Sequence, residues 1–194
     1  MSMDPPAQAP AGQISADGQF QWDGQQWMPL AKNYRVPTPW TRPMQLISAA
    51  IFAASAIGGV AVTLIFVNHD SVLRALQAQG TQVPSGTSMD TVINVTIGVT
   101  YAISIVFALL WLVAAIGSYL GWRWVFWAAL ILFGLSGISA LTTIGSLANP
   151  DRSIIPASGL IVSEIFDVLG LAMFVWMLIA VIKYGPWAMK RPGA

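Results

Sequence analysis

The chain has 194 residues, of which 56% are hydrophobic and only 9% are charged, and its formal net charge is +1. Average soluble domains carry about 25% charged residues, so this composition excludes an ordinary soluble domain and the clustered basic surface of a nucleic-acid-binding protein. The chain has no cysteine and a single histidine, which excludes disulfides, thiol catalysis, thiolate metal sites and sites built from several histidines.

The first 43 residues are polar and rich in proline, glycine and glutamine. Residues 1–16 are of low complexity and contain too little apolar surface to order themselves, so they predict a disordered tail. Residues 17–30 predict a compact aromatic module, and residues 31–43 a linker whose prolines oppose helix formation. No cleavable signal peptide is expected, because the polar start is followed by an apolar run that is too long for a signal sequence.

The aromatic module contains two copies of Asp-Gly-Gln, each followed by a tryptophan, in the sequence DGQFQWDGQQW. Asp-Gly between two short alternating segments predicts a β-hairpin, because a type I′ turn requires positive φ at both central residues. With Asp23-Gly24 as a two-residue turn, Phe20 lies opposite Trp27. Phe20, Trp22 and Trp27 then share one face of the hairpin.

The segment Trp22-Asp23-Gly24-Gln25-Gln26-Trp27 resembles the short Trp-Asp-Gly-x-x-Trp modules that precede transmembrane segments in many small bacterial membrane proteins. This chain lacks the upstream Gly-Trp-Tyr-x-Asp-Pro half of the better-defined module. The family is uncharacterised, so the resemblance implies a cytoplasmic appendage on a bacterial inner-membrane protein and no activity.

Two interpretations of the module remain open. The aromatic side chains either form a very small fold that docks on its own linker or the membrane surface, or they anchor a protein partner, as aromatic residues do at interfaces. An isolated two-stranded hairpin is marginally stable in water, so both interpretations predict contact with another surface. The candidate partner-binding residues are Phe20, Trp22, Asp23, Gly24 and Trp27.

Four long apolar runs follow the linker, at 44–67, 91–120, 124–147 and 157–182. A helix of roughly 20 residues crosses the hydrocarbon core of a bilayer. Only helices and closed barrels satisfy every backbone group in lipid, and these runs lack the alternation of barrel strands. We therefore predict an all-α membrane protein embedded in a lipid bilayer: a four-helix transmembrane bundle over 44–184, with a short N-terminal cytoplasmic β-hairpin and a cytoplasmic tail over 185–194.

The connections between the spans differ in length. The first, residues 68–90, opens with SVLRALQAQ, which predicts a short amphipathic helix that ends at Gly80. The second, residues 121–123, is so short that spans two and three are expected to form a tight antiparallel hairpin. The third contains a predicted turn at 149–151. With Gly-Trp-Arg-Trp between spans two and three, the four spans also resemble small four-helix bacterial proteins of unknown function.

The positive charges beside the spans predict the orientation of the bundle. Seven lie on one side and two on the other, so the positive-inside rule puts both termini in the cytoplasm of a bacterial cell, with a multi-pass protein in its cytoplasmic membrane. The seven are Lys32, Arg35, Arg42, Arg123, Lys183, Lys190 and Arg191, and the two are Arg74 and Arg152. The aromatic belt expected at the cytoplasmic boundary comprises Trp40, Tyr119, Trp122, Trp124, Trp127, Tyr184 and Trp187.

Two acidic residues, Glu164 and Asp167, lie within the fourth run and share one helix face. One interpretation makes them outer-interface acids, favoured by the positive end of the helix dipole and paired with Arg152 or Arg74. The other makes them part of an ion path, because ionisable residues within a span often face a cavity. The candidate polar site for that path comprises Asn94, Tyr101, Thr142, Glu164 and Asp167.

Motifs for chemistry are missing from the sequence, which contains no HExxH, GxSxG, P-loop or dinucleotide-binding glycine pattern. We expect no catalytic residue, metal site or cofactor, and a solvated interface position for His69. The GxxxG pair Gly117 and Gly121 favours close packing of helices within the chain over a homo-oligomer, which remains an alternative.

These features predict a non-enzymatic accessory or scaffolding protein of a bacterial cytoplasmic membrane. The Phe20, Trp22 and Trp27 face would contact a protein partner or the inner leaflet. The alternative is a small transporter or channel component that uses Glu164 and Asp167.

Overall fold

The computed structural model describes residues 10–30, 34–80, 86–148 and 153–192. Its helices are α1 (Thr41–Phe66), α2 (His69–Ala78), α3 (Met89–Tyr119), α4 (Arg123–Ala148), α5 (Ala157–Lys183) and the 3₁₀ helix η2 (Pro186–Ala188). Its strands are β1 (Phe20–Trp22), β2 (Trp27–Pro29), β3 (Val36–Pro37) and β4 (Met189–Lys190). The turn predicted at 149–151 and the cation Arg152 lie outside the described residues, as do residues 1–9, 31–33, 81–85 and 193–194.

Helices α1, α3, α4 and α5 are each long and apolar enough to cross a membrane. Their ends lie within three residues of the predicted ends. Helix α1 begins earliest relative to the prediction because Pro43 fits the first turn of a helix, where a missing N–H costs nothing. Large aliphatic side chains such as Ile57 and Leu141 are exposed on the outside of the bundle, as lipid-facing residues are. The predicted all-α, four-helix transmembrane bundle is confirmed.

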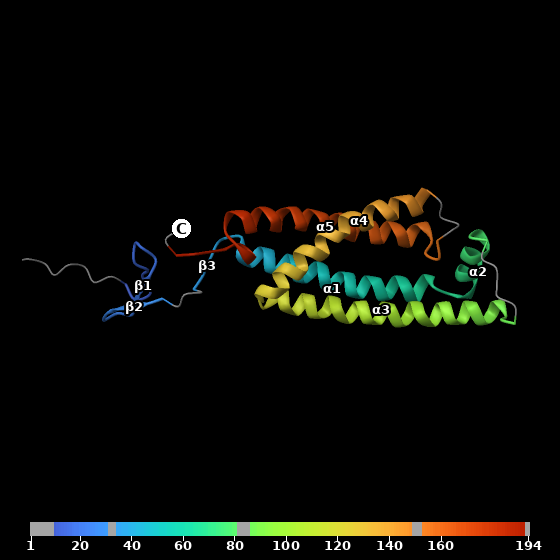
Figure 1. The fold of residues 1–194 in the computed structure, drawn as a ribbon, viewed down its shortest axis with the longest axis horizontal. Coiled ribbons are helices and arrows are strands. Elements are labelled where there is room, and N and C mark those ends of the chain that lie inside the picture. The colour runs from blue at the N-terminus through green and yellow to red at the C-terminus, as the bar shows by residue number, and fades with distance from the viewer. Residues whose placement is uncertain (1–9, 31–33, 81–85, 149–152, 193–194) are drawn as a thin grey trace, which may run out of the picture.

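The four spans form two antiparallel pairs, α1 beside α3 and α4 beside α5 (Figure 1). Helices α3 and α4 meet near their short connection, where Gly117 lies against Val125, and α4 then crosses the bundle toward α5. The tight hairpin expected for spans two and three is therefore wrong. A short connection brings two helix ends together, but it leaves their crossing angle to side-chain packing.

We call the end of the bundle where α1 begins and α5 finishes the terminal end, and the opposite end the distal end. At the distal end, α2 is the predicted amphipathic helix. Its N-terminus is closed by a capping box between Asn68 and Ser71, and Gly80 follows its C-terminus at a φ of +67°. The buried Val72 packs on Ile93 at the start of α3, which fixes α2 across the end of the bundle.

The terminal end is closed by the C-terminal segment. After Gly185 the chain takes positive φ at Trp187 (57°) and Ala188 (52°), which turns it back into the bundle. Trp187 is fully buried, its indole N–H donates to the backbone oxygen of Trp122 at 2.9 Å, and its ring meets Phe126 edge-on at 5.3 Å. The expected place of Trp187 in an interfacial belt is therefore wrong, because the reversed backbone carries it into the core.

The same segment joins the two ends of the chain. Strand β4 pairs antiparallel with β3, so that Met189 lies opposite Pro37 and Lys190 opposite Val36. The hydroxyl of Thr41 at the start of α1 donates to the backbone oxygen of Ala188 at 3.0 Å. The end of the linker and the C-terminal tail, whose contact the sequence did not indicate, are held together at the terminal end of the bundle.

Candidate functional site

The aromatic module is a β-hairpin with a register different from the prediction. Trp22 lies opposite Trp27, and Phe20 lies opposite Pro29. The loop therefore spans four residues in place of the two expected. The cause is the Asp23 carboxylate, which accepts hydrogen bonds from the backbone N–H groups of Gln25 and Gln26, both at 2.7 Å. This aspartate side chain stabilises a wider turn than Asp-Gly alone would form.

A third segment adds to the hairpin. The backbone N–H of Trp22 donates to the oxygen of Gln13 at 2.8 Å, and the N–H of Ser15 donates to the oxygen of Phe20 at 2.9 Å. Residues 12–15 thus run along the free edge of β1, within a stretch that was expected to belong to a disordered tail. An added segment is the kind of support that a marginal two-stranded hairpin requires.

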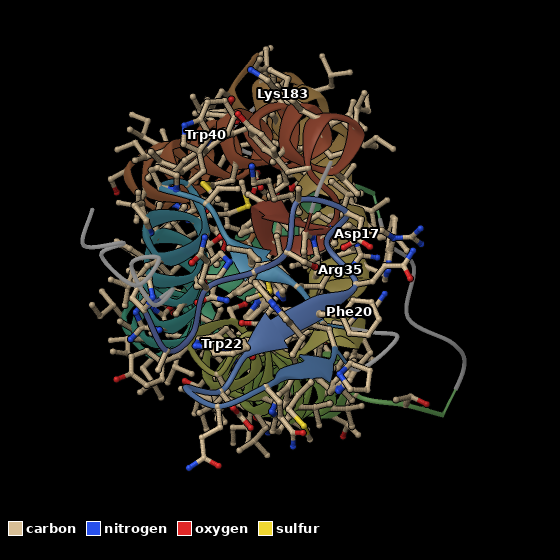
Figure 2. The ribbon with its side chains drawn as sticks, turned by 90° about the vertical axis from the view of Figure 1, so that its left-hand side faces the viewer. Asp17, Phe20, Trp22, Arg35, Trp40 and Lys183 are labelled. Atoms are coloured by element: carbon tan, nitrogen blue, oxygen red, sulfur yellow. The ribbon has the colours of Figure 1, made fainter. Side chains whose placement is uncertain are left out.

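The module has one aromatic face. Phe20, Trp22 and Trp27 share it as expected, in spite of the changed register, and the two indole rings lie 5.5 Å apart. Trp27 is 43% exposed and Phe20 is also exposed, whereas Trp22 is half-buried. Met28, which is 47% exposed, points to the opposite face. Figure 2 views the module from the terminal end, with Phe20 and Trp22 on the hairpin in front of the bundle.

Two carboxylates belong to the local structure of the module. Hydrogen bonds from the backbone N–H groups of Gln26 and Gln25 lower the pKa of Asp23, and a hydrogen bond from the Ser15 hydroxyl lowers the pKa of Asp17. Both carboxylates are exposed and ionised at neutral pH. Asp23 therefore contributes to the turn through its side chain, and Gly24 through its φ of +108°.

The structure disperses the residues of the predicted polar site. Asn94 and Thr142 are exposed on the outside of the bundle, and the Tyr101 hydroxyl donates to the backbone oxygen of Val67 at 2.9 Å. Glu164 has one enclosed carboxylate oxygen without a hydrogen-bond partner among the described residues. Asp167 alone of the five lines the cavity described next. Neither acid forms an ion pair with Arg74 in the described part of the chain.

The cavity has a volume of about 500 Å³ and lies between the two helix pairs. All four spans line it, with α1 and α3 on one side and α4 and α5 on the other. Asp167 reaches it from α5, about 24 Å along the helix from Lys183 at the terminal end. Ser139 of α4 lies beside the Asp167 carboxyl group, and both side chains line the cavity. The volume lies within the roughly 300–1,000 Å³ typical of small-molecule sites.

Stacked aromatic rings form the floor of the cavity on its terminal side. The ring of Phe52 lies between two others, 4.5 Å from Phe133 and 5.4 Å from Trp111, and nearly parallel to both. All three residues line the cavity. Beyond them toward the terminal end, the core is closed by Phe126 and Trp187. The cavity therefore belongs to the middle and distal part of the bundle.

Sequence reasoning missed most of the cavity lining because it selected polar residues by depth and not by the direction in which they point. A better signal was present on α4, where Ser136, Ser139 and Thr143 recur at intervals of three and four residues and so share one helix face. That face lines the cavity opposite Asp167.

His69 lies at the distal end and is half exposed, with its Nε2 atom 3.3 Å from a carboxylate oxygen of Asp90. Within the described residues, no group of three histidine, cysteine, aspartate or glutamate side chains could hold a metal ion. The chain matches no protein-family model, no curated protein and no solved structure in the comparisons.

Proposed function

We propose that this protein is a non-enzymatic accessory protein of a bacterial cytoplasmic membrane, and that its aromatic module recruits a protein partner to the membrane. The observation that carries the proposal is the exposed aromatic face of Phe20 and Trp27 on a module that projects beyond the terminal end of a membrane bundle (Figure 1). Exposed aromatic side chains on a small rigid face are typical anchors of protein interfaces.

The charges of the bundle support a cytoplasmic location for the module. Six described cations lie at or near the terminal end, and Arg74 on α2 lies at the distal end. The positive-inside rule favours the cytoplasm for the more basic end of a membrane protein. The six are Arg35, Arg42, Arg123, Lys183, Lys190 and Arg191.

The charge of the module favours a protein partner over the inner leaflet. Residues 10–30 contain two acids, Asp17 and Asp23, and no lysine or arginine. The cytoplasmic leaflet is negatively charged and attracts basic segments, so it repels an acidic module. The aromatic face would therefore gain little from lipid headgroups, while a protein pocket could take both exposed rings.

The test is a pull-down of the full-length protein from bacterial membranes in mild detergent, with mass spectrometry of the proteins that co-purify. Trp27→Ala and Phe20→Ala remove the exposed rings, and the partner should fall to less than a tenth of the wild-type amount. Met28→Ala is the matched control, since Met28 neighbours Trp27, is about as exposed and lies on the other face. It should retain the partner.

Two results would overturn the proposal. One is equal recovery of every co-purifying protein from wild type, Trp27→Ala and Met28→Ala. The other is binding of the module to anionic lipid vesicles that depends on Trp27, which would make the aromatic face a membrane contact.

A second candidate function is that of a small transporter or channel component, and the cavity beside Asp167 is the observation that favours it. In that case Asp167→Asn should lower proton flux into proteoliposomes that contain a pH-sensitive dye, without changing partner recovery. The stacked floor formed by Phe52, Phe133 and Trp111 would have to open during transport. Flux equal to that of protein-free liposomes would contradict this candidate.

A further inference from the structure

Among the described residues, the lining of the cavity contains one ionisable side chain, that of Asp167. None of the described lining residues is lysine, arginine or histidine. The Asp167 carboxyl group lies beside Ser139 and forms no ion pair within the described part of the chain. A carboxylate held among membrane-spanning helices is costly unless a cation or several donors compensate it. Ser139 is a polar neighbour of this carboxyl group, and the cavity beside it leaves room for a cation from outside.

The hydroxyl groups of the lining present acceptors to the cavity. The protons of Ser163 and Ser136 are donated to the backbone oxygens of Gly159 and Leu132 one turn earlier, at 3.2 and 3.4 Å. The Thr63 hydroxyl lies within hydrogen-bond distance of two acceptors, the backbone oxygen of Gly59 at 2.9 Å and the Ser104 hydroxyl at 3.1 Å. A hydroxyl has one proton and two lone pairs, so these groups offer lone pairs to a ligand. Lone pairs and a carboxylate suit a positively charged or hydrogen-bond-donating ligand and disfavour an anion.

The remaining lining is apolar and aromatic. Phe166 on α5 and Phe107 on α3 add two rings to the stacked floor of Phe52, Phe133 and Trp111. Aromatic faces attract cations through their quadrupole, most strongly where water is excluded. They also accommodate the hydrocarbon part of a ligand. The cavity therefore combines one carboxyl group, several acceptors and aromatic walls.

We propose that this cavity binds an amphipathic organic cation, with the positive charge beside Asp167 and Ser139 and the apolar part against the aromatic walls. The inference is independent of the aromatic module. The proposed ligand would occupy the same cavity that the transporter candidate would use. The inference requires only that the ligand binds there, and it does not require transport of the ligand across the membrane.

The test uses tetraphenylphosphonium as the probe and tetraphenylborate as its partner of similar size and opposite charge. The full-length protein is reconstituted in nanodiscs of phosphatidylcholine, and radiolabelled probe bound at equilibrium is measured against empty nanodiscs. We expect saturable binding of tetraphenylphosphonium and none of tetraphenylborate. Asp167→Asn should weaken the binding of the cation at least about tenfold, since it removes the charge that the cation faces.

Two controls keep the result interpretable. Asp90→Asn makes the same chemical change at the exposed start of α3, outside the cavity, and should bind like wild type. Ser104→Leu narrows the cavity from α3 without altering its charge and should also weaken binding.

Equal binding of the two probes, or equal binding of the cation by wild type and Asp167→Asn, would overturn the inference. Either result would indicate that lipid chains fill the cavity or that the probe partitions into the disc. Saturable, Asp167-dependent binding without any flux in liposomes would support the inference and contradict the transporter candidate, so the two can fail separately.

Discussion

The terminal and distal halves of the bundle solve the same packing problem in different ways. The terminal half is filled: Trp187 enters from the C-terminal segment and meets Phe126, while Met44 and Met177 occupy the space around them. The distal half is hollow, with a cavity of about 500 Å³ lined by serine, threonine and glycine as well as aromatic rings. The stacked ring of Phe52 lies at the boundary between the two.

This difference shows where the stability of the bundle resides. Lipid provides no hydrophobic drive for helices to associate, so close packing must hold them together, and the terminal half has most of it. The distal half has small residues that could allow close approach, yet its two helix pairs leave a space between them. Because packing in the terminal half holds the helices together, the distal half can contain a cavity without the bundle coming apart.

The largest expected effect comes from emptying the filled half. Trp187→Ala removes a fully buried side chain and its hydrogen bond to Trp122, and should lower the free energy of unfolding by about 3–5 kcal/mol. Unfolding in mixed micelles, followed by circular dichroism during a titration with sodium dodecyl sulfate, measures this loss. Trp127→Ala is the control at the same end, where the side chain is exposed, and should cost far less. Equal losses would show that Trp187 does not hold the terminal half together.

A second prediction compares the two halves along one helix. Ser118 on α3 is fully buried in the terminal half, and Ser104 on the same helix lines the cavity. Ser118→Leu should overpack the core and lower the free energy of unfolding by about 1–3 kcal/mol. Ser104→Leu loses the hydrogen bond with Thr63 but should cost less than Ser118→Leu, because the cavity has room for the larger side chain. The same titration measures both variants, and the reverse order would contradict the distinction between a filled and a hollow half.

The smallest expected effect is the pH dependence of the stability of the aromatic module. The module lies outside both halves of the bundle and so provides a reference for them. The pKa of Asp23 is lower in the folded module than in the unfolded chain, where it is about 3.9. Its contribution to stability is therefore complete above that pH and is lost as the pH falls through the folded pKa. The circular dichroism of the neighbouring Trp22 and Trp27 rings, which are tilted by 58° to each other, should weaken over this range, and Asp23→Asn should lessen the pH dependence. A matching loss of helix would show that module and bundle unfold together.

The sequence predicted the spans well and their arrangement poorly, for physical reasons. Hydropathy alone determines which segments cross a membrane, so the predicted ends lie within three residues of the observed ends. Helix pairing depends on which side chains interlock, and the crossing of α4 leaves no periodic signal. The C-terminal fold was missed because Trp187 and Ala188 take positive φ, a conformation that residues with a Cβ rarely adopt.

For the candidate sites, the sequence predicted which residues take part better than it predicted how those residues are arranged. The aromatic face of Phe20, Trp22 and Trp27 was predicted correctly although the register was wrong, since the side-chain period of two survives the change of turn. Asp167 was selected for its charge and depth. Tyr101 was misplaced because the backbone oxygen of Val67, the buried residue that follows α1, is a nearby acceptor that only the fold brings within its reach.

The pairing of β3 with β4 sets an upper limit on the distance between the aromatic module and the bundle. From Leu30 to Val36 there are six residue steps, so the module is tethered within about 20 Å of the paired strands. If the strands separated, the anchor would retreat to Thr41, and eleven steps would extend the tether to nearly 40 Å. The effective concentration of the module near any fixed target would then fall roughly 2.5-fold, as the −3/2 power of the tether length. The two short strands thus shorten the maximum distance between the module and the point where it is attached to the membrane bundle.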